Sequence, residues 1–206
     1  MKPVRKIRKQ ADATPDVRRA VLDAALHIIS QDGPDAVSMR EVARQAGVSH
    51  QAPYHYFGDR AGIFAAISEE GFTQFAEELE ESLLTDDPLV HCLNTYVLFA
   101  MAHKGHYRVM FRQDICGVSS HESTRLAADR AFLALLDLAS QVDPDNTDSE
   151  NPLVLPTTLW AHAHGLATLM IDGPLLHKLP PETDIKKFVQ QVGLFASRSF
   201  RDQVNQ

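Results

Sequence analysis

With 206 residues, the chain is long enough for one large domain or for a small domain joined to a medium-sized one. A content of 44% hydrophobic and 23% charged residues is typical of a globular protein and excludes a wholly disordered chain. The two cysteines, Cys92 and Cys116, have no CxxC spacing, so neither a disulfide framework nor a thiolate zinc site is indicated, and a reducing cytoplasm is expected.

Charge is distributed unevenly along the sequence. Residues 1–60 contain ten basic and seven acidic residues, a net charge of +3, whereas residues 61–206 contain ten and twenty, a net charge of −10. The first 19 residues alone contain seven basic and two acidic residues, a net charge of +5. Because Lys and Arg neutralise phosphates, a basic end on an acidic protein predicts contact with nucleic acid there, although a solvated tail has the same composition.

The basic start does not have the features of a signal peptide, because the polar stretch Gln10–Pro15 stands where an apolar segment is required. The longest apolar run, Tyr96–Ala102, is far shorter than the roughly 20 residues that cross a bilayer. We therefore expect no export signal, no membrane contact, and a cytoplasmic, nucleoid-associated location.

The first predicted helix begins at Thr14, whose hydroxyl stands at the N-cap, with Pro15 and Asp16 in the first turn. Apolar residues then recur at helical spacing until Gly33-Pro34 ends the helix.

A second helix, Met39–Ala46, is predicted from the spacing of Ser38 and Glu41, which is that of a capping box. Gly47 supplies the left-handed residue that ends it. Ser49 is then predicted to cap a third helix after a turn of only three residues.

The third helix runs from His50 to about Phe57. Two short helices joined by a tight glycine turn form a helix-turn-helix, whose second helix can enter the major groove of DNA. Such helix pairs also occur in all-α proteins that bind no DNA. Tyr54, His55, Tyr56 and Phe57 are more rings than so short a helix can bury. We expect Phe57 to lie in the core, and Tyr54 and Tyr56 to present hydroxyls to phosphates.

At these residues the sequence resembles the N-terminal domain of the TetR family over about residues 14–67. The resemblance is carried by Ser38–Ala43, Ala46–Ser49, Ala52–Arg60 and Ile63-Phe64. Further on, Trp160-Ala161-His162-Ala163-His164-Gly165 resembles the Trp-x-x-x-His-Gly (WHG) signature of one branch of C-terminal domains in this family. His106–Phe111 resembles the segment that this branch carries before its seventh helix.

The resemblance implies an all-α fold of about nine helices. A basic flexible arm (1–13) would precede a three-helix helix-turn-helix domain (14–60), and a long helix would join it to a larger helical ligand-binding and dimerisation domain (61–206). The arm would reach along the DNA backbone or into a minor groove.

The resemblance also implies roles in DNA binding. His50, Gln51 and His55 would face base edges, and the Gln51 amide is suited to adenine. Tyr54 and Arg60 would hold phosphates. The complete set expected to contact DNA is Ser38, Arg40, Ser49, His50, Gln51, Tyr54, His55, Tyr56 and Arg60. Pro53 departs from the aliphatic residue usual in the family, and in a helix that begins at His50 it would remove the first intrahelical hydrogen bond.

The rest of the chain is predicted to be helical. Asp59 would cap a long fourth helix that ends near Leu84, and an acidic linker over 143–152 lacks the ligand spacing of a calcium-binding EF-hand. A fifth helix is predicted to begin after Pro88. Four more are predicted over Tyr107–Ile115, Thr124–Ser140, Leu153–Asp172 and Ile185 to about Phe200. In the family the last two pack against a two-fold mate as a four-helix bundle, which the small residues Ala161, Ala163, Gly165 and Ala167 would permit.

A ligand pocket is implied by the resemblance, with ordinary core packing as the alternative for each residue. Its candidate lining residues are Phe99, Met101, Tyr107, Met110, Phe111, Phe132, Trp160 and His164. The paired histidines His103/His106 and His162/His164 lack a further ligand at suitable spacing, so we expect no metal and no cofactor.

The sequence thus predicts a homodimeric repressor that binds a palindromic DNA operator and is released by a small-molecule effector. A ligand-independent architectural or cell-cycle protein of the same fold is the alternative. An enzyme is not supported, because the sequence has no Gly-x-Ser-x-Gly elbow, phosphate loop or nucleotide fingerprint.

Overall fold

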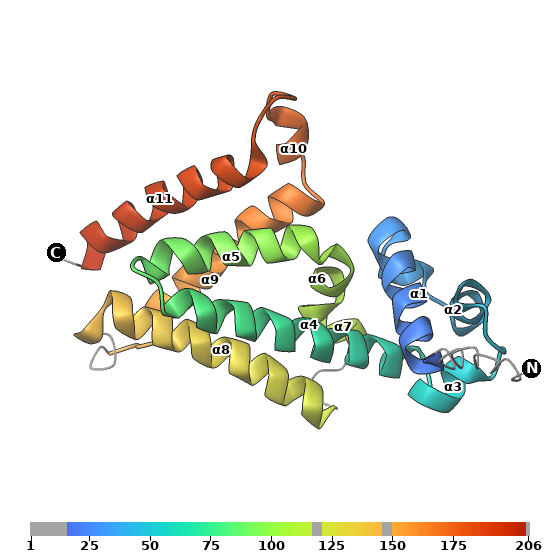
Figure 1. Ribbon diagram of the computed structural model, residues 1–206. Coiled ribbons are helices and arrows are strands. Elements are labelled where there is room, and N and C mark those ends of the chain that lie inside the picture. Colours follow the sequence, from blue (N-terminus) through green and yellow to red (C-terminus); the bar gives the residue numbers. More distant parts are fainter. Residues whose placement is uncertain (1–15, 117–120, 146–149, 205–206) are drawn as a thin grey trace, which may run out of the picture.

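The computed structural model describes residues 16–116, 121–145 and 150–204, and within these ranges it contains eleven α-helices, one 3-10 helix and no strand. Figure 1 shows a small group of N-terminal helices at one end, joined by one long helix to a larger helical body. The predicted all-α architecture is confirmed.

The N-terminal group consists of α1 (Val17–Asp32), the 3-10 helix η1 (Pro34–Ala36), α2 (Met39–Ala46) and α3 (Ala52–Phe57). Asp16 caps α1 by accepting a hydrogen bond from the Arg19 amide, so the helix begins later than predicted. The predicted cap, Thr14, lies outside the described residues. The inward faces of α1, α2 and the first turns of α4 share one core, whose fully buried members include Leu22, Ile29, Val42 and Ile63.

The long helix α4 (Arg60–Leu83) begins as predicted, with the Asp59 carboxylate accepting from the Gly62 amide at 2.9 Å. Gly62 is required here, because a Cβ at this position would lie only 1.9 Å from the Phe57 carbonyl oxygen. The close turn between α3 and α4 therefore fixes the third helix directly on the helix that enters the body (Figure 1).

The body contains seven helices, and four of them, α5 to α8, contact α4. In this body α8 packs along α4, α5 packs against both α4 and α9, and α11 lies over α5 (Figure 1). The helices are α5 (Pro88–Ala102), α6 (Lys104–Met110), α7 (Gln113–Cys116), α8 (Glu122–Val142), α9 (Val154–Ile171), α10 (Leu175–Lys178) and α11 (Ile185–Val204).

Two differences from the prediction account for the higher helix count. The predicted helix over Tyr107–Ile115 is two helices, because the backbone makes short-range bonds from Arg112 to Val109 (2.9 Å) and from Ile115 to Arg112 (3.1 Å). Such turns keep the apolar spacing, so the sequence pattern does not reveal the break. The four-residue α10 is too short to show a periodicity.

Among the described residues, no helix combines the length and apolar character that crossing a membrane requires.

Candidate functional site

The turn between α2 and α3 has the geometry expected of a helix-turn-helix. Gly47 adopts a left-handed conformation (φ 67°, ψ 28°) that ends α2. Ser38 accepts from the Glu41 amide at 3.2 Å, which confirms one half of the predicted capping box. The other half is replaced, because the Glu41 carboxylate accepts hydrogen bonds from Arg44 in the next turn.

Helix α3 begins two residues later than predicted. The Ala52 amide donates to the Ser49 carbonyl at 3.0 Å in a turn, and Gln51, not Ser49, occupies the N-cap position. Pro53 therefore lies in the first turn of the helix, where amides have no intrahelical acceptor. The prediction that Pro53 removes the first intrahelical hydrogen bond was therefore wrong.

The outer face of α3 and its preceding turn is polar and aromatic. His50, Gln51, Tyr54, His55 and Tyr56 are all exposed, and the two tyrosines retain 43% and 45% exposure although they are large rings. The His50 and Tyr54 rings lie 5.8 Å apart. Exposed rings on so short a helix have no role in the core of this chain, so the face is available to a partner.

The other sequence-predicted residues lie near this face with different surroundings. Ser38, Arg40 and Ser49 are exposed, and Phe57 packs against the core as predicted. Arg60 is engaged within the chain: it donates to the Pro34 carbonyl at 2.8 Å and lies over the Phe64 ring. Its side chain remains 40% exposed, so contact with a phosphate would compete with these internal contacts.

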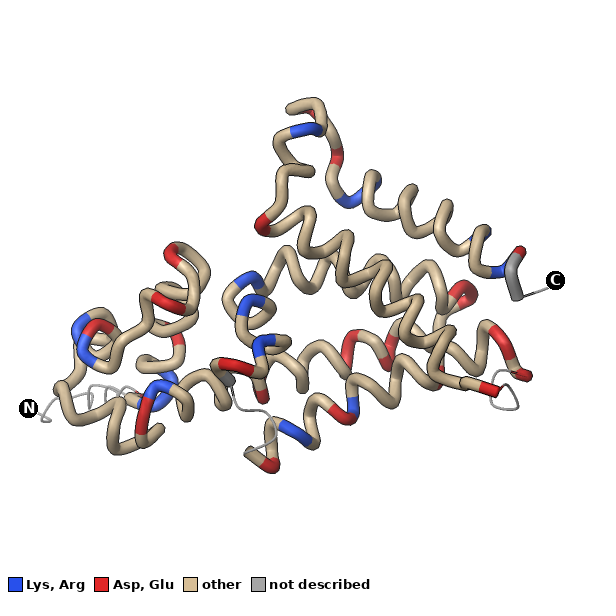
Figure 2. Tube along the Cα trace, turned by 180° about the vertical axis from the view of Figure 1, so that it is seen from behind, with Lys and Arg blue, Asp and Glu red and all other residues tan. Residues whose placement is uncertain are grey.

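The positive charge of the N-terminal part lies mainly in the arm. Residues 16–60 contain five basic and six acidic residues, a net charge of −1, and the two signs are interspersed along α1 and α2, whereas α3 contains no Lys, Arg, Asp or Glu (Figure 2). The basic excess that predicted nucleic-acid contact falls in residues 1–15, outside the described ranges.

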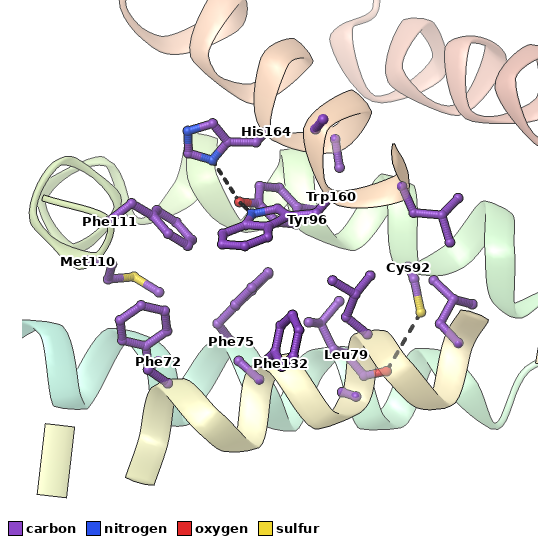
Figure 3. Close-up of a pocket in the computed structure, with 18 of the residues that line it drawn as sticks. Phe72, Phe75, Leu79, Cys92, Tyr96, Met110, Phe111, Phe132, Trp160 and His164 are labelled. Carbon is purple, nitrogen blue, oxygen red and sulfur yellow. Dashed lines mark hydrogen bonds between the residues drawn. The ribbon is translucent and has the colours of Figure 1, made fainter. Parts of the chain in front are cut away.

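A cavity of about 620 Å³ lies in the body between α4, α5, α8 and α9. Its walls are mainly hydrocarbon and aromatic (Figure 3). The aromatic lining residues are Phe72, Phe75, Tyr96, Phe111, Phe132 and Trp160, joined by His164.

Three polar lining residues, Tyr96, Trp160 and His164, form a hydrogen-bonded cluster with Tyr107. The hydroxyls of Tyr96 and Tyr107 lie 2.9 and 3.0 Å from Nδ1 of His164 (Figure 3 shows the first). Trp160 Nε1 donates to the Tyr96 hydroxyl at 3.1 Å. Burial lowers the pKa of His164 and raises the pKa of Tyr96, so the cluster is uncharged at neutral pH.

Of the eight candidate ligand residues, five line this cavity: Met110, Phe111, Phe132, Trp160 and His164. Tyr107 reaches the cluster from α6 but lines a neighbouring cavity instead. Phe99 packs between Phe75 and His103, with ring centroids 5.0 and 4.5 Å away, and Met101 is half-buried against the core. Neither of these two residues is part of the lining.

Sequence reasoning did not single out the α4 and α5 walls. Phe72, Phe75 and Leu79 recur at helical spacing, which indicates an apolar helix face but not a cavity, although they line the cavity. Tyr96 carried a usable signal, because a tyrosine within an apolar helix needs a partner for its hydroxyl.

A second cavity of about 510 Å³ lies where the N-terminal helices meet the body. It shares Phe111 and His164 with the larger cavity, and it is also lined by Asp32, Arg108 and Asp172. Phe111 and His164 therefore stand between the two cavities, and Tyr107 reaches His164 from the second one.

Two polar links join the N-terminal helices to the body. Arg108 on α6 donates to the carbonyls of Ile29 (3.0 Å) and Ser30 (2.9 Å) at the end of α1, and to Asp172 after α9. Arg19 on α1 pairs with Glu70 on α4, whose carboxylate is 3.1 Å from His106 Nε2 on α6.

The paired histidines do not form a metal centre in the part of the chain that the structure describes, where no three His, Cys, Asp or Glu residues come together in a suitable group.

Two family models match the chain. One, described as "Bacterial regulatory proteins, tetR family", covers residues 21–67, and one, described as "Tetracyclin repressor-like, C-terminal domain", covers residues 89–192.

Curated relatives match less than half of the chain. The transcriptional regulator AcrR of Shigella flexneri is 37% identical over 84 residues, which is 40% of this chain and 39% of that protein. The regulator BetI of Rhizobium meliloti is 46% identical over 52 residues, which is 25% of this chain and 26% of that protein. The chain thus spans well under half the length of these relatives.

Solved structures match over nearly the whole chain. A Rhodococcus sp. RHA1 protein of unknown function superposes with a TM-score of 0.75 and 25% identity, covering 96% of this chain and all of that one. AibR, in a complex with isovaleryl coenzyme A and operator DNA, has the same fold, with a TM-score of 0.60, 16% identity and coverage of 85% and 95%.

Proposed function

The chain belongs to the TetR family of bacterial regulatory proteins, and we propose that it represses transcription as a homodimer bound to a palindromic operator. Members of this family are DNA-binding transcriptional regulators and not enzymes. The proposal assigns DNA reading to residues 14–60, with the arm 1–13 on the DNA backbone, and dimerisation and sensing to residues 61–206.

The observation that carries the proposal is the exposed outer face of α3 at one end of α4, with an aromatic-lined cavity along the same helix. The proposal assigns base edges to His50, Gln51 and His55, which are exposed on this face. Tyr54 and Tyr56 beside them provide hydroxyls for phosphates. A protein that needed neither DNA nor ligand would have no use for both features.

Dimerisation is assigned to α9 and α11. Helix α9 contains no charged residue, and neither does the stretch 188–197 of α11 (Figure 2). Leu169 is 47% exposed and Phe195 is 75% exposed on these helices. Exposed apolar residues on uncharged helices indicate a protein interface, and a two-fold mate would place two α3 helices on two half-sites.

Release is assigned to the larger cavity. Phe72, Phe75 and Leu79 on α4 form one of its walls, and α4 continues directly to the turn that holds α3. A ligand that shifts α4 would change the separation of the two reading helices. An open cavity favours such a sensor over the ligand-independent architectural protein, whose core would be filled. AibR, whose structure contains both an acyl coenzyme A and operator DNA, is an example of the fold holding both partners.

We also assign the C-terminal half to the WHG branch. This assignment is supported by Trp160 and His164, the named residues of the signature, which both form a hydrogen bond with the Tyr96 hydroxyl.

The experiment is a selection of genomic DNA fragments by the full chain, followed by fluorescence anisotropy on the selected sequence. The proposal expects a palindromic consensus upstream of genes and an affinity at least about a thousandfold above that for random DNA at the same salt concentration. Equal affinity for selected and random DNA would support the architectural alternative.

A further inference from the structure

The larger cavity contains almost no charge. Among the described residues that line it, Asp129 alone has a formal charge at neutral pH; it is exposed and pairs with Arg125 at 2.9 Å. The Cys92 thiol stays neutral because burial raises its pKa to about 12. No Lys or Arg is among the lining residues. A buried anion or cation would therefore lose its hydration without gaining an opposite charge.

The hydrogen-bonding cluster has more donors than acceptors close by. In a neutral imidazole protonated at Nε2, Nδ1 of His164 offers one lone pair, yet the hydroxyls of both Tyr96 and Tyr107 lie within 3.0 Å of it. Tyr107 has further acceptors at longer range, the His164 carbonyl at 3.4 Å and the Thr168 hydroxyl at 3.3 Å. When Tyr107 donates to Nδ1, the hydroxyl hydrogen of Tyr96, which lines the cavity, is available to an oxygen that enters it.

The remaining walls of the cavity favour a ligand with flat ring or hydrocarbon surfaces. Phe75 and Tyr96 meet edge to face at 4.9 Å, and the Trp160 ring lies 6.1 Å from Phe111 and 6.4 Å from Phe132. Figure 3 shows these rings around the cavity, with the His164 cluster at one side. Ring faces and edges at such spacings attract another ring system.

We propose that the cavity binds a neutral, largely apolar molecule with a ring system and one hydroxyl, carbonyl or ether oxygen, which accepts a hydrogen bond from the Tyr96 hydroxyl beside His164. The inference rests on the proposed role of the cavity as the effector site and adds the chemical class of the effector. Carboxylates and amines of the same size are excluded by the missing counter-charge.

The test compares four probes with one ring system: 9-anthracenemethanol, 9-anthracenecarboxylate, 9-anthracenemethylammonium and 9-methylanthracene. Binding to the full chain is followed by quenching of Trp160, the only tryptophan, and operator binding is measured in the same samples. The alcohol should bind about tenfold or more tightly than either ion, because the cavity offers the ions no opposite charge.

Tyr96→Phe and Tyr107→Phe test the position of the oxygen. Each removes a hydroxyl but keeps the ring, and at least one should weaken alcohol binding about three- to tenfold. Binding of 9-methylanthracene, which has no oxygen, should not change and serves as the control. Circular dichroism of both variants checks that they fold, and alcohol binding unchanged in both would overturn the assigned position.

The remaining outcomes separate this inference from the proposed function. A carboxylate or ammonium that binds more tightly than the alcohol and releases the operator would overturn the ligand class and leave the effector role intact. An alcohol that binds in the predicted order without affecting operator binding would support the ligand class and overturn the effector role. Failure of all four probes to bind would overturn both.

Discussion

Gln51 and Arg60 have different surroundings, and these predict different roles in DNA binding. Gln51 is exposed at the N-cap of α3, whereas Arg60 is held by the Pro34 carbonyl and the Phe64 ring. Gln51→Ala should cost about 1–3 kcal/mol on the operator, relax the preference at one base pair and leave binding to random DNA unchanged.

Arg60→Ala should weaken binding to all sequences and lower the salt slope by about one. It should also lower the thermal stability, because η1 loses its link to α4. Anisotropy titrations at several salt concentrations measure both variants, with Arg125→Ala on the distant α8 as the matched control. Equal losses on operator and random DNA for both variants would contradict this division of roles.

The contact between buried His106 and half-buried Glu70 predicts how stability depends on pH. Burial lowers the pKa of His106 and outweighs the opposite effect of the Glu70 carboxylate. Burial raises the pKa of Glu70, but hydrogen bonds from Arg19 and His106 outweigh it and leave that pKa below its usual range. Below about pH 6.5 the unfolded chain therefore binds more protons than the folded one, and stability decreases as the pH falls.

The expected result is a lower free energy of unfolding in urea at pH 5.5 than at pH 7.5, with the Glu70 contribution lost only at more acidic pH. In His106→Gln the decrease should be smaller, since the variant cannot take up this proton. His91→Gln, at an exposed position on α5, is the control and should retain the full decrease. A stability that rises on acidification would show that the imidazole is charged in the folded protein.

At the residue scale, exposure of the α3 face could be predicted from sequence, because so many rings exceed what a six-residue helix can bury. The internal contacts of Arg60 could not, since the Pro34 carbonyl and Phe64 reach it only through tertiary packing. Tyr96 and His164 are 68 residues apart, and no local pattern relates them.

Helix α6 connects the cavity to the N-terminal helices through adjacent residues. Tyr107 reaches His164, and Arg108 binds the end of α1 and Asp172. Arg108→Ala should therefore retain binding of 9-anthracenemethanol but lose most of its effect on operator affinity, a coupling that is typically about 1–3 kcal/mol.

Arg112→Ala provides the matched control for this prediction. Arg112 is four residues along the chain and is exposed, with a pair to Asp114 in its own segment. Operator anisotropy with and without the probe measures the coupling. If the probe changes the operator affinity of Arg108→Ala as much as that of the native chain, α6 does not couple the cavity to the DNA-binding helices.

At the element scale, the sequence predicted the helices whose ends carry chemical signals. Asp59, Pro88 and Gly47 mark helix ends through a side-chain cap, a fixed φ and a left-handed turn, and the structure places helix ends at all three. The start of α3 was misplaced because Ser49 has the side chain of a cap, while the backbone continues through one more turn before the helix begins.

At the scale of the whole molecule, the exposed apolar side chains of α9 and α11 predict the oligomeric state. Phe195→Asp should convert the dimer to a monomer in analytical ultracentrifugation, because it places a charge in the centre of an apolar interface. Ligand binding should persist, and operator affinity should fall because only one half-site is held. Leu84→Asp is the matched control, since Leu84 is 88% exposed at the end of α4 and away from the proposed interface. A Phe195→Asp variant that remains a dimer would move the interface elsewhere.

The larger organisation, with a reading end, a connecting helix and a cavity-containing body, was expected from the family resemblance more than from local patterns. Helix periodicity identifies each apolar face but not which helix covers it. For this reason the sequence does not reveal the cavity walls on α4, and the open space between α4, α5, α8 and α9 appears only in three dimensions.

Hydroxyl-radical footprinting of the selected operator tests the central claim most directly. A homodimer with one α3 per subunit should protect two half-sites related by two-fold symmetry, with centres one or a few DNA turns apart, about 34–36 Å per turn. A single protected stretch without two-fold symmetry would contradict the account.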